Sequence, residues 1–280
     1  MKHRDESVCA VVRASRCAFV VFATVILLGS GCSGSRGNSL RSERPSVGAL
    51  ATIPATSVSR TVIEDGLQSV RAPIATSTAG EIEMFRFDPA QYRFDLAATS
   101  SRLNIGAWAA RLPGASAIVN GGYYLEDGSP AGYFAVNGER IGKAAFDLDK
   151  TALLVFDEGA EIVDTSSTDF ALSGLKTAMQ TYPFLVRDGA PAVREDSGKT
   201  ARRSFIGVDR DGGVWMGVVA NADVTLYELS RRLVGLGVEW RDVVNLDGGP
   251  STGISVRFTS GRVVRETFGG VPNVIAAFKK

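Results

Sequence analysis

The pattern of apolar and polar positions predicts a domain of short strands with two helices. Segments with strict alternation, or with short apolar runs bounded by turn residues, are typical of strands. The segments that fit are 81–87, its expected hairpin partner 92–97, 116–119, 203–208, 214–219, 242–246 and 273–278. Apolar residues three and four positions apart predict helices at 105–112 and 226–236, the second with a capping box at Thr225 and Glu228. This mixture indicates the α+β class, with a mixed β-sheet core and a few helices.

Two stretches of turn residues are expected to close hairpins. Residues 209–213 lie between two predicted strands, and residues 258–262 carry a similar turn pattern. Asp209 and Asp211 could also begin a calcium loop, but the twelfth position of such a loop carries no acidic residue here. A hairpin turn therefore fits the sequence better.

The same order of elements occurs twice along the chain. A helix and a buried strand are followed by Asn120 and a Gly-Gly pair, and later by Asn245 with Gly248-Gly249 close behind. This order suggests a weak internal pseudo-repeat that brings two glycine-rich turns to one cleft. A chance match is the alternative, because Gly-Gly after a strand is common turn chemistry.

The first 31 residues resemble a secretory signal of the lipoprotein type. Basic residues precede an apolar run from Cys17 to Leu28, and small residues then lead into Cys32. The run is too short to span a bilayer comfortably as a helix. We therefore expect export to a bacterial cell envelope, lipidation of Cys32, and the membrane as a partner through that anchor. An uncleaved N-terminal anchor is the alternative.

Residues 32–66 are expected to form a flexible tether, and residues 67–280 the folded domain. The tether is rich in Ser, Gly, Thr, Ala and Arg and has no periodicity. The three cysteines and the single histidine, His3, all precede the domain. This excludes a Ser-His-Asp triad, a thiol nucleophile and an imidazole zinc site from residues 67–280.

Charge and composition narrow the function further. The 31 Lys and Arg residues are balanced by 30 Asp and Glu residues, which leaves a formal net charge of +1. Without a basic excess, nucleic acid is not an expected partner. No cofactor is expected either, although a single Ca²⁺ on oxygen ligands stays open.

The densest combination of glycine and polar residues lies at the two glycine-rich turns. Asp247 follows an apolar strand and emerges at its end, a common location for a functional carboxylate; the alternative is an aspartate that caps its own turn. Arg202 and Arg203 precede another strand. Opposite a nest of glycine N–H groups, one of them would bind phosphate or carboxylate; the alternative is a surface pair.

These segments resemble the phosphodiester glycosidase family. The resemblance extends from about residue 81 to 278 and rests on five segments in the family's order: Asn120–Tyr124, Pro130–Gly138, Gln180–Gly189, Arg203–Gly207 and Asn245–Ser251. It implies hydrolysis of a sugar joined through its anomeric carbon to a phosphodiester. The chain departs from the family pattern in three places: Pro250 replaces a glycine, Ser204 replaces a threonine, and the acidic residue after the aromatic pair is displaced to Glu126 or Asp127.

The resemblance implies roles for individual residues. We expect Arg203 to neutralise the phosphate, Asp247 to stabilise an oxocarbenium-like centre or activate water, and Asn120 to hold a sugar hydroxyl or the water. The residues expected to bind substrate are Gly121, Gly122, Tyr123, Asn245, Gly248, Gly249, Ser251 and Thr252.

Two other functions stay open. A non-catalytic envelope lipoprotein could bind anionic glycans with the same cleft, which Pro250 and the displaced acidic residue favour. A metal-dependent phosphodiesterase would need clustered acidic or histidine ligands, and the sequence presents no such cluster.

Overall fold

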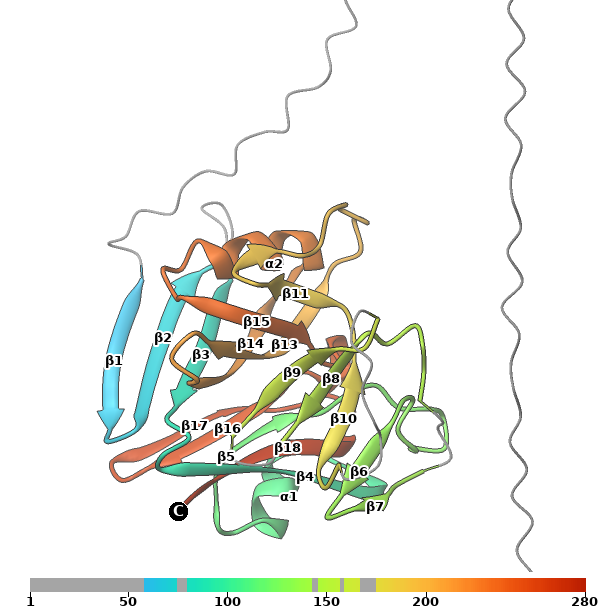
Figure 1. Cartoon of the computed structure of the whole chain (residues 1–280). Coiled ribbons are helices and arrows are strands. Elements are labelled where there is room, and N and C mark those ends of the chain that lie inside the picture. Colours follow the sequence, from blue (N-terminus) through green and yellow to red (C-terminus); the bar gives the residue numbers. More distant parts are fainter. Residues whose placement is uncertain (1–57, 75–79, 143–145, 157–158, 167–174) are drawn as a thin grey trace, which may run out of the picture. The chain divides into compact units, whose positions relative to one another are not determined.

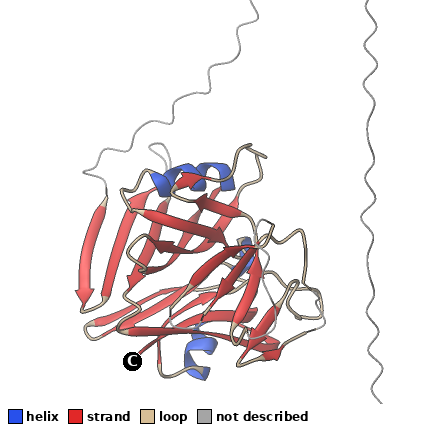
Figure 2. Cartoon of the chain, viewed as in Figure 1, coloured by secondary structure: helices blue, strands red, loops and turns tan. Residues whose placement is uncertain are grey.

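The computed structural model describes residues 58–74, 80–142, 146–156, 159–166 and 175–280. These residues form three β-sheets with two α-helices, and strands predominate (Figures 1 and 2). The expected β-sheet core with a few helices is confirmed, but strands predominate, so the fold is mostly β rather than α+β. The difference arises chiefly between residues 134 and 191, where short strands occur without a clear alternating pattern.

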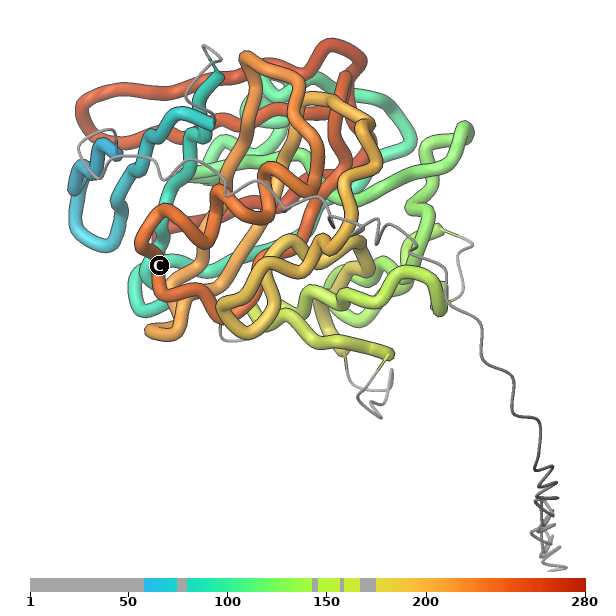
Figure 3. Tube along the Cα trace, turned by 90° about the horizontal axis from the view of Figure 1, so that it is seen from above, coloured from blue at the N-terminus to red at the C-terminus, as the bar shows by residue number. Residues whose placement is uncertain are grey.

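The first sheet has eight strands in the order β1-β2-β3-β14-β13-β15-β11-β12. They are β1 (Ser59–Glu64), β2 (Leu67–Pro73), β3 (Glu81–Phe87), β11 (Phe184–Arg187), β12 (Ala190–Pro191), β13 (Ala201–Asp209), β14 (Val214–Val224) and β15 (Trp240–Asn245). The predicted hairpin over 203–219 is confirmed, because β13 and β14 pair antiparallel with Val208 opposite Val214. The β1–β2 hairpin, drawn in blue, forms one edge of this sheet (Figure 3).

The other two sheets have five strands each, in the orders β17-β16-β5-β18-β4 and β7-β6-β10-β8-β9. The second sheet contains β4 (Tyr92–Leu103), β5 (Ala115–Asn120), β16 (Ile254–Phe258), β17 (Gly261–Arg265) and β18 (Val271–Lys279). The third contains β6 (Phe134–Val136), β7 (Glu139–Arg140), β8 (Ala152–Val155), β9 (Glu161–Asp164) and β10 (Ala178–Thr181). The predicted hairpin at 258–262 and the closing strand at 273–278 are thereby confirmed.

Four apolar clusters hold the described sheets and helices together: three form layers, and the smallest lies within the third sheet. The central layer draws on all three sheets, with Phe85, Val119 and Leu154 as examples from each. A second layer packs α2 (Leu226–Val234) on the outer face of the first sheet, and a third packs α1 (Ile105–Arg111) on the outer face of the second sheet (Figure 1). The strands between two such layers are buried on both faces.

The central strands show how burial on both faces shapes the sequence. On β13, Phe205 points to the layer beneath α2, whereas Ile206 points to the central layer. Successive strand residues face opposite sides, so a strand buried on both faces has a continuous apolar run. β3 is likewise largely buried on both faces although its sequence is not continuously apolar; its charged Glu83 is buried and paired with Arg71 and Arg265.

Both predicted helices form close to their expected positions. The side chain of Asn104 caps α1 by accepting from the backbone N–H of Ala107, and Thr225 caps α2 by accepting from the N–H of Glu228. α2 ends at Val234, two residues before the expected end at 236, and Gly235 is its C-terminal cap. No helix within the described residues is long and apolar enough to cross a membrane.

The expected hairpin between 81–87 and 92–97 is wrong. The chain turns at Asp88, which accepts from the backbone N–H of Ala90, and then leaves the first sheet. β4 instead pairs with β18 in the second sheet, with Phe94 opposite Ala277. The local pattern correctly predicts two strands, but β3 pairs with β2 and β14, and β4 takes its partner β18 from the far end of the chain.

The turn at 209–213 is the predicted hairpin turn. The carboxylate of Asp209 accepts from the backbone N–H groups of Asp211 and Gly213, from the indole of Trp215 at 2.8 Å and from Arg86 at 2.6 Å. This aspartate is therefore used to hold the turn.

The folded part begins earlier than expected. β1 lies inside the segment 32–66 that was expected to be a tether, and it pairs with β2 with Thr61 opposite Ser69. Glu64 accepts from the hydroxyl of Tyr92 at 3.0 Å and from that of Thr259 at 2.9 Å. The boundary at residue 67 is thus too late. The signal segment 1–31 and Cys32 lie outside the described residues.

Candidate functional site

The two glycine-rich turns meet where β5 and β15 end, as the sequence predicts. The backbone N–H of Asp247 donates to the carbonyl of Gly121 at 3.1 Å, and the Asn120 amide donates to the carbonyl of Asp247 at 2.7 Å. β5 and β15 belong to different sheets, so the contact joins the two sheets at this point. The turns also follow equivalent elements, α1–β5 and α2–β15, but the pseudo-repeat itself stays a prediction.

Asn120 is a positioning residue in this arrangement. Its side chain is fully buried. Its Oδ1 accepts from the Ser204 hydroxyl at 2.6 Å and from the backbone N–H of Gly253 at 3.1 Å, while its Nδ2 serves Asp247 and Gly121. An asparagine amide has two donors and two acceptor sites, and all are in use. We therefore revise its expected contact with substrate to a role in holding the turns together.

Gly121 and Gly122 are also buried, and their glycine identity follows from packing. A Cβ atom on Gly121 would lie 2.0 Å from the side-chain oxygen of Asn273, and one on Gly122 would lie 3.3 Å from the carbonyl of Gln180. The N–H of Gly121 donates to the carbonyl of Asn273. We therefore revise their expected role from substrate binding to close packing of the turn.

Asp247 is a half-buried carboxylate at the end of β15. Burial raises the pKa of Asp247 above its usual 3.8, while hydrogen bonds from the Ser251 hydroxyl and the Gly248 backbone oppose that rise. The Gly248 N–H donates to Oδ1 at 2.9 Å. Within the described part of the chain, no basic side chain forms an ion pair with Asp247. The carboxylate is thus desolvated without being neutralised, which is typical of functional sites.

Arg203 brings a cation to the same turn. Its guanidinium donates to the carbonyls of Val224 and Lys199, at 3.0 and 2.8 Å. Burial lowers the pKa of Arg203, and no described carboxylate forms an ion pair with it. A Cβ atom on Gly248 would lie 3.8 Å from Nη1 of Arg203 and only 2.8 Å from the Arg202 carbonyl. Glycine is therefore required at position 248, and it keeps the guanidinium close to the Asp247 turn.

Tyr123 lies near both Asp247 and Arg203 and is hydrogen-bonded to Tyr182, which carries a second aromatic ring. Its hydroxyl accepts from Nδ2 of Asn245 at 2.6 Å and donates to the carbonyl of Tyr182 at 3.2 Å. Burial raises the pKa of Tyr123; the nearby Asp247 raises it further, and Arg203 opposes the rise. The Tyr123 hydroxyl thus lies in the electrostatic field of both charged groups. Asn245 is itself buried, so we revise its role from substrate contact to positioning of Tyr123.

Tyr182 also lies at the site, although the sequence did not indicate it as a candidate. Its ring is 40% exposed, lies 4.8 Å from the Tyr123 ring and is tilted 35° from it. Nζ of Lys150 lies 5.4 Å from the centre of the Tyr182 ring. An exposed aromatic ring held against another is suited to packing on a sugar ring. Tyr182 lies in one of the segments of the family resemblance, but its exposure has no signal in the sequence.

The turn after Asp247 separates exposed from buried residues. Gly249 has a φ of 59° and open space around its Cα, so the backbone is accessible there. Ser251 and Thr252 are buried, and the Ser251 hydroxyl lies 3.3 Å from that of Tyr124. We therefore revise Ser251 and Thr252 from substrate contact to support of the turn, and retain Gly248 and Gly249 as substrate-binding candidates.

Arg202 stabilises the same turn with a buried side chain. Its guanidinium donates to the Gly249 carbonyl at 2.7 Å and lies 3.8 Å from the centre of the Phe268 ring. The backbone N–H of Phe268 in turn donates to the carbonyl of Pro250. Pro250, the departure from the family pattern, thus lies within the short 3-10 turn Gly249–Ser251 and contributes its carbonyl to that contact.

The site supplies the carboxylate of Asp247, the guanidinium of Arg203 and accessible backbone at Gly249. The rings of Tyr123 and Tyr182 form an aromatic wall beside them. Within the described ranges, no group of three or more His, Cys, Asp or Glu side chains could hold a metal ion. The arrangement suits an anionic ligand that also has a flat or sugar-like face.

Comparisons with known proteins agree with the sequence resemblance. The chain is similar to a hypothetical protein from Synechocystis, with 16% identity, a TM-score of 0.52 and coverage of 80% of this chain but only 64% of that one. It is also similar to the catalytic domain of zebrafish N-acetylglucosamine-1-phosphodiester alpha-N-acetylglucosaminidase auto-inhibited by pro-peptide, with 13% identity, a TM-score of 0.55 and coverage of 80% and 82%.

At these identities the structural likeness shows the fold alone. The comparison with curated proteins gave no match. The family model for phosphodiester glycosidases, in contrast, matches residues 113–278. Since this match covers more than half of the 280 residues, the chain belongs to the phosphodiester glycosidase family.

Proposed function

We propose that the protein hydrolyses the bond between the anomeric carbon of a sugar and a phosphodiester. The observation that carries the proposal is the presence of two half-buried charges of opposite sign at one turn. Asp247 directly precedes Gly248, the Arg203 guanidinium lies close to Gly248, and neither charge forms an ion pair with a described residue. Desolvated, unpaired charges of opposite sign suit a reaction in which positive and negative charge develop at neighbouring atoms.

The reaction assigns one charge to each developing centre. Water adds to the anomeric carbon, the bond from that carbon to the phosphate oxygen breaks, and the proton released by water ends on the phosphomonoester. Arg203 neutralises the departing phosphate, whose oxygens match a guanidinium. Asp247 stabilises the oxocarbenium-like carbon or accepts the proton of the attacking water. A phosphodiester leaves readily, so less acid assistance is needed than in ordinary glycoside hydrolysis.

In this proposal the sugar packs on the aromatic wall formed by Tyr123 and Tyr182, close to Asp247 and Arg203. The exposed ring of Tyr182 suits the apolar face of a sugar. Lys150 lies over the same ring but is ion-paired with Asp147. The zebrafish protein is named for removing N-acetylglucosamine from such a phosphodiester. An α-N-acetylglucosaminyl phosphodiester is therefore the first substrate to assay.

Product analysis tests the proposal directly. Free sugar with a phosphomonoester is the expected result. A sugar phosphate would instead indicate cleavage of the P–O bond by a phosphodiesterase. Binding without turnover would favour an envelope protein that binds anionic glycans. Either of these two results would overturn the proposed hydrolysis.

We further propose that the enzyme acts in the bacterial cell envelope as a lipoprotein. The support is the apolar run before Cys32 and the small residues that lead into it. A phosphate-linked glycan or glycolipid of the envelope would then be the natural substrate class.

A further inference from the structure

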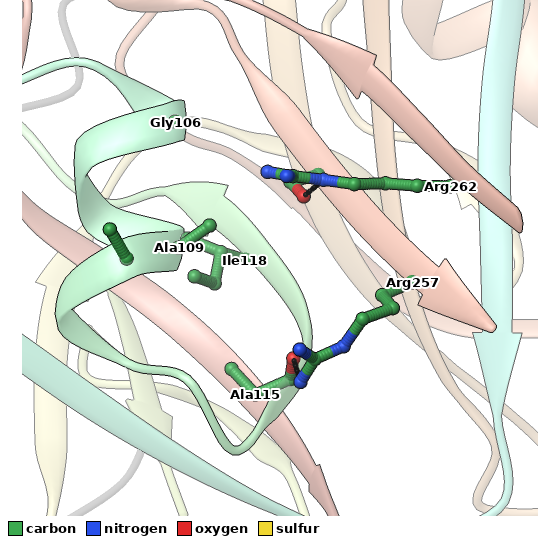
Figure 4. A pocket seen from close by; sticks show the side chains of 8 residues that line it. Gly106, Ala109, Ala115, Ile118, Arg257 and Arg262 are labelled. Carbon is green, nitrogen blue, oxygen red and sulfur yellow. Dashed lines mark hydrogen bonds between the residues drawn. The ribbon is translucent and has the colours of Figure 1, made fainter.

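A cavity of about 180 Å³ lies between α1 and the β16–β17 hairpin, on the outer face of the second sheet (Figure 4). The small residues Gly106 and Ala109 of α1 leave this space open. Arg257 of β16 and Arg262 of β17 extend toward it from the hairpin (Figure 4). None of these residues belongs to the candidate site around Asp247, so the cavity needs an explanation of its own.

Arg257 and Arg262 are directly opposite one another in the register of the hairpin. Opposite residues share one face of an antiparallel pair, and like charges at such positions are destabilising. Neither guanidinium forms an ion pair with any carboxylate in the part of the chain that the structure describes. The fold therefore holds two like charges together and supplies no counter-charge within contact distance.

Uncharged groups fix both guanidinium groups in place. Nε of Arg262 donates to the Ser255 hydroxyl at 3.1 Å, and Nη2 of Arg257 donates to the carbonyls of Pro113 and Ala115 at 2.5 and 2.9 Å. These bonds orient the side chains but leave their charge in place. A guanidinium has five N–H donors, so each retains donors for a ligand. Groups that are already ordered lose less entropy when they bind.

We propose that this cavity binds a phosphate group between Arg257 and Arg262. Two positive forks match a tetrahedral dianion in both charge and geometry. At roughly 30 Å³ per water molecule, the cavity has room for one such oxyanion with a few waters. The carboxylate of Glu266 lies beside Gly106, 2.8 Å from the position of a Cβ there, on the α1 side of the cavity.

Titration with inorganic phosphate at constant ionic strength tests the site, with calorimetry and the melting temperature as readouts. The wild-type protein is expected to bind phosphate saturably, whereas sodium chloride gives no such response. Arg262→Gln, which keeps a polar group near Ser255, is expected to weaken phosphate binding by about tenfold or more. Arg111→Gln removes the same charge from an exposed residue of α1 that does not line the cavity, and it is the matched control.

A second readout separates ligand binding from a structural role. Without phosphate, Arg262→Gln removes the repulsion between the two arginines, so its melting temperature is expected to equal or exceed that of the wild type. Titration with glycerol 1-phosphate shows whether the bound phosphate is a free ion or part of a larger molecule. If glycerol 1-phosphate binds as tightly as inorganic phosphate, the site accepts a phosphate carried on a larger molecule. If it binds more weakly, the natural ligand is the free ion, and both results support the site.

Three outcomes would overturn the proposal. The first is a wild-type protein without a saturable phosphate response. The second is equal weakening by Arg262→Gln and Arg111→Gln, which would mean unspecific attraction. The third uses Arg203→Ala, because phosphate is also the group expected at the candidate site. A response lost in Arg203→Ala and kept in Arg262→Gln would place all phosphate binding at Arg203.

Discussion

Asn120 donates a hydrogen bond to the main-chain carbonyl of Asp247 at 2.7 Å, although the two residues are 127 positions apart. This bond joins the end of β5 to the turn that carries the candidate carboxylate. We expect Asn120→Ala to lower the free energy of unfolding by about 1–3 kcal/mol, because it leaves the buried Ser204 hydroxyl and Gly253 N–H without their partner. Urea denaturation measures the change. Asn221→Ala removes an exposed amide and serves as the control, and an equal loss there would contradict the assigned role.

Asp247→Asn is expected to lower turnover by about 100-fold or more while ligand binding stays largely intact. The amide keeps the size of the side chain but cannot accept a proton or stabilise positive charge. Single-turnover kinetics and calorimetry on the same phosphodiester separate the two effects. A variant with unchanged turnover would remove Asp247 from the mechanism.

The same substitution is expected to stabilise the fold at neutral pH. Burial raises the pKa of Asp247 above 3.8, so the native state holds the proton more tightly than the unfolded chain does. The stability from this group is therefore fully present below about pH 3.8 and is lost as the pH rises through the native pKa. Asp247→Asn should gain stability over the wild type at pH 7 and lose that gain near pH 3.8. Thermal unfolding at both pH values checks this, with the exposed Asp149→Asn as control; a gain at pH 7 that equals the control's would contradict it.

Arg203→Ala is expected to weaken binding of a sugar phosphodiester by about 1.5–3 kcal/mol, the range for a hydrogen bond to a charged group. A neutral glycoside with the same sugar should be affected far less. Arg203→Lys keeps the positive charge but loses the paired N–H donors of the guanidinium, so its affinity for the phosphodiester should lie between those of the wild type and Arg203→Ala. Calorimetry with both ligands decides the matter, and equal weakening for the two ligands would show that Arg203 does not bind the phosphate.

Tyr182→Ala is expected to raise KM several-fold, because loss of an aromatic contact costs about 0.5–1.5 kcal/mol. Tyr182→Phe should behave like the wild type, since Tyr123 bonds to the carbonyl of Tyr182 and the ring remains. Steady-state kinetics of both variants gives the comparison. If Phe and Ala substitutions raise KM alike, the hydroxyl rather than the ring contributes.

Cys32→Ser is expected to move the protein from the membrane fraction to a soluble fraction. The variant lacks the thiol that would carry lipid, so any retention must have another cause. Fractionation of cells followed by immunodetection provides the measurement. Unchanged membrane retention would indicate an uncleaved N-terminal anchor instead.

Local signals in the sequence account for much of the fold. The hairpin of β13 and β14 and the cap of α2 by Thr225 depend on neighbouring residues, so their patterns were sufficient. The partner of β4 could not be predicted, because β18 lies at the other end of the chain and any apolar strand would satisfy the same alternation. Short strands such as β6 and β10 carry too few residues for a periodic signal.

The candidate site, too, could be predicted from the sequence only in part. The meeting of the two glycine-rich turns could be expected from the repeated order of helix, strand and asparagine. The sequence could not show that Asn120 and Asn245 point into the protein, because an amide looks alike whether it contacts substrate or buried backbone. Tyr182 becomes part of the site only through its bond to Tyr123, which folding alone creates.

The early start of the first strand has a practical consequence for handling the protein. A shortened chain that begins at residue 67 would lose β1 and leave β2 as the edge of the eight-stranded sheet. Leu67 and Val70 of that strand are fully buried at present, and Glu64 would no longer accept from Tyr92. An unpaired strand with apolar side chains is a template for self-association. Such a chain is expected to aggregate during expression, whereas one that begins before Ser59 keeps the exposed, mostly polar β1 as its natural edge.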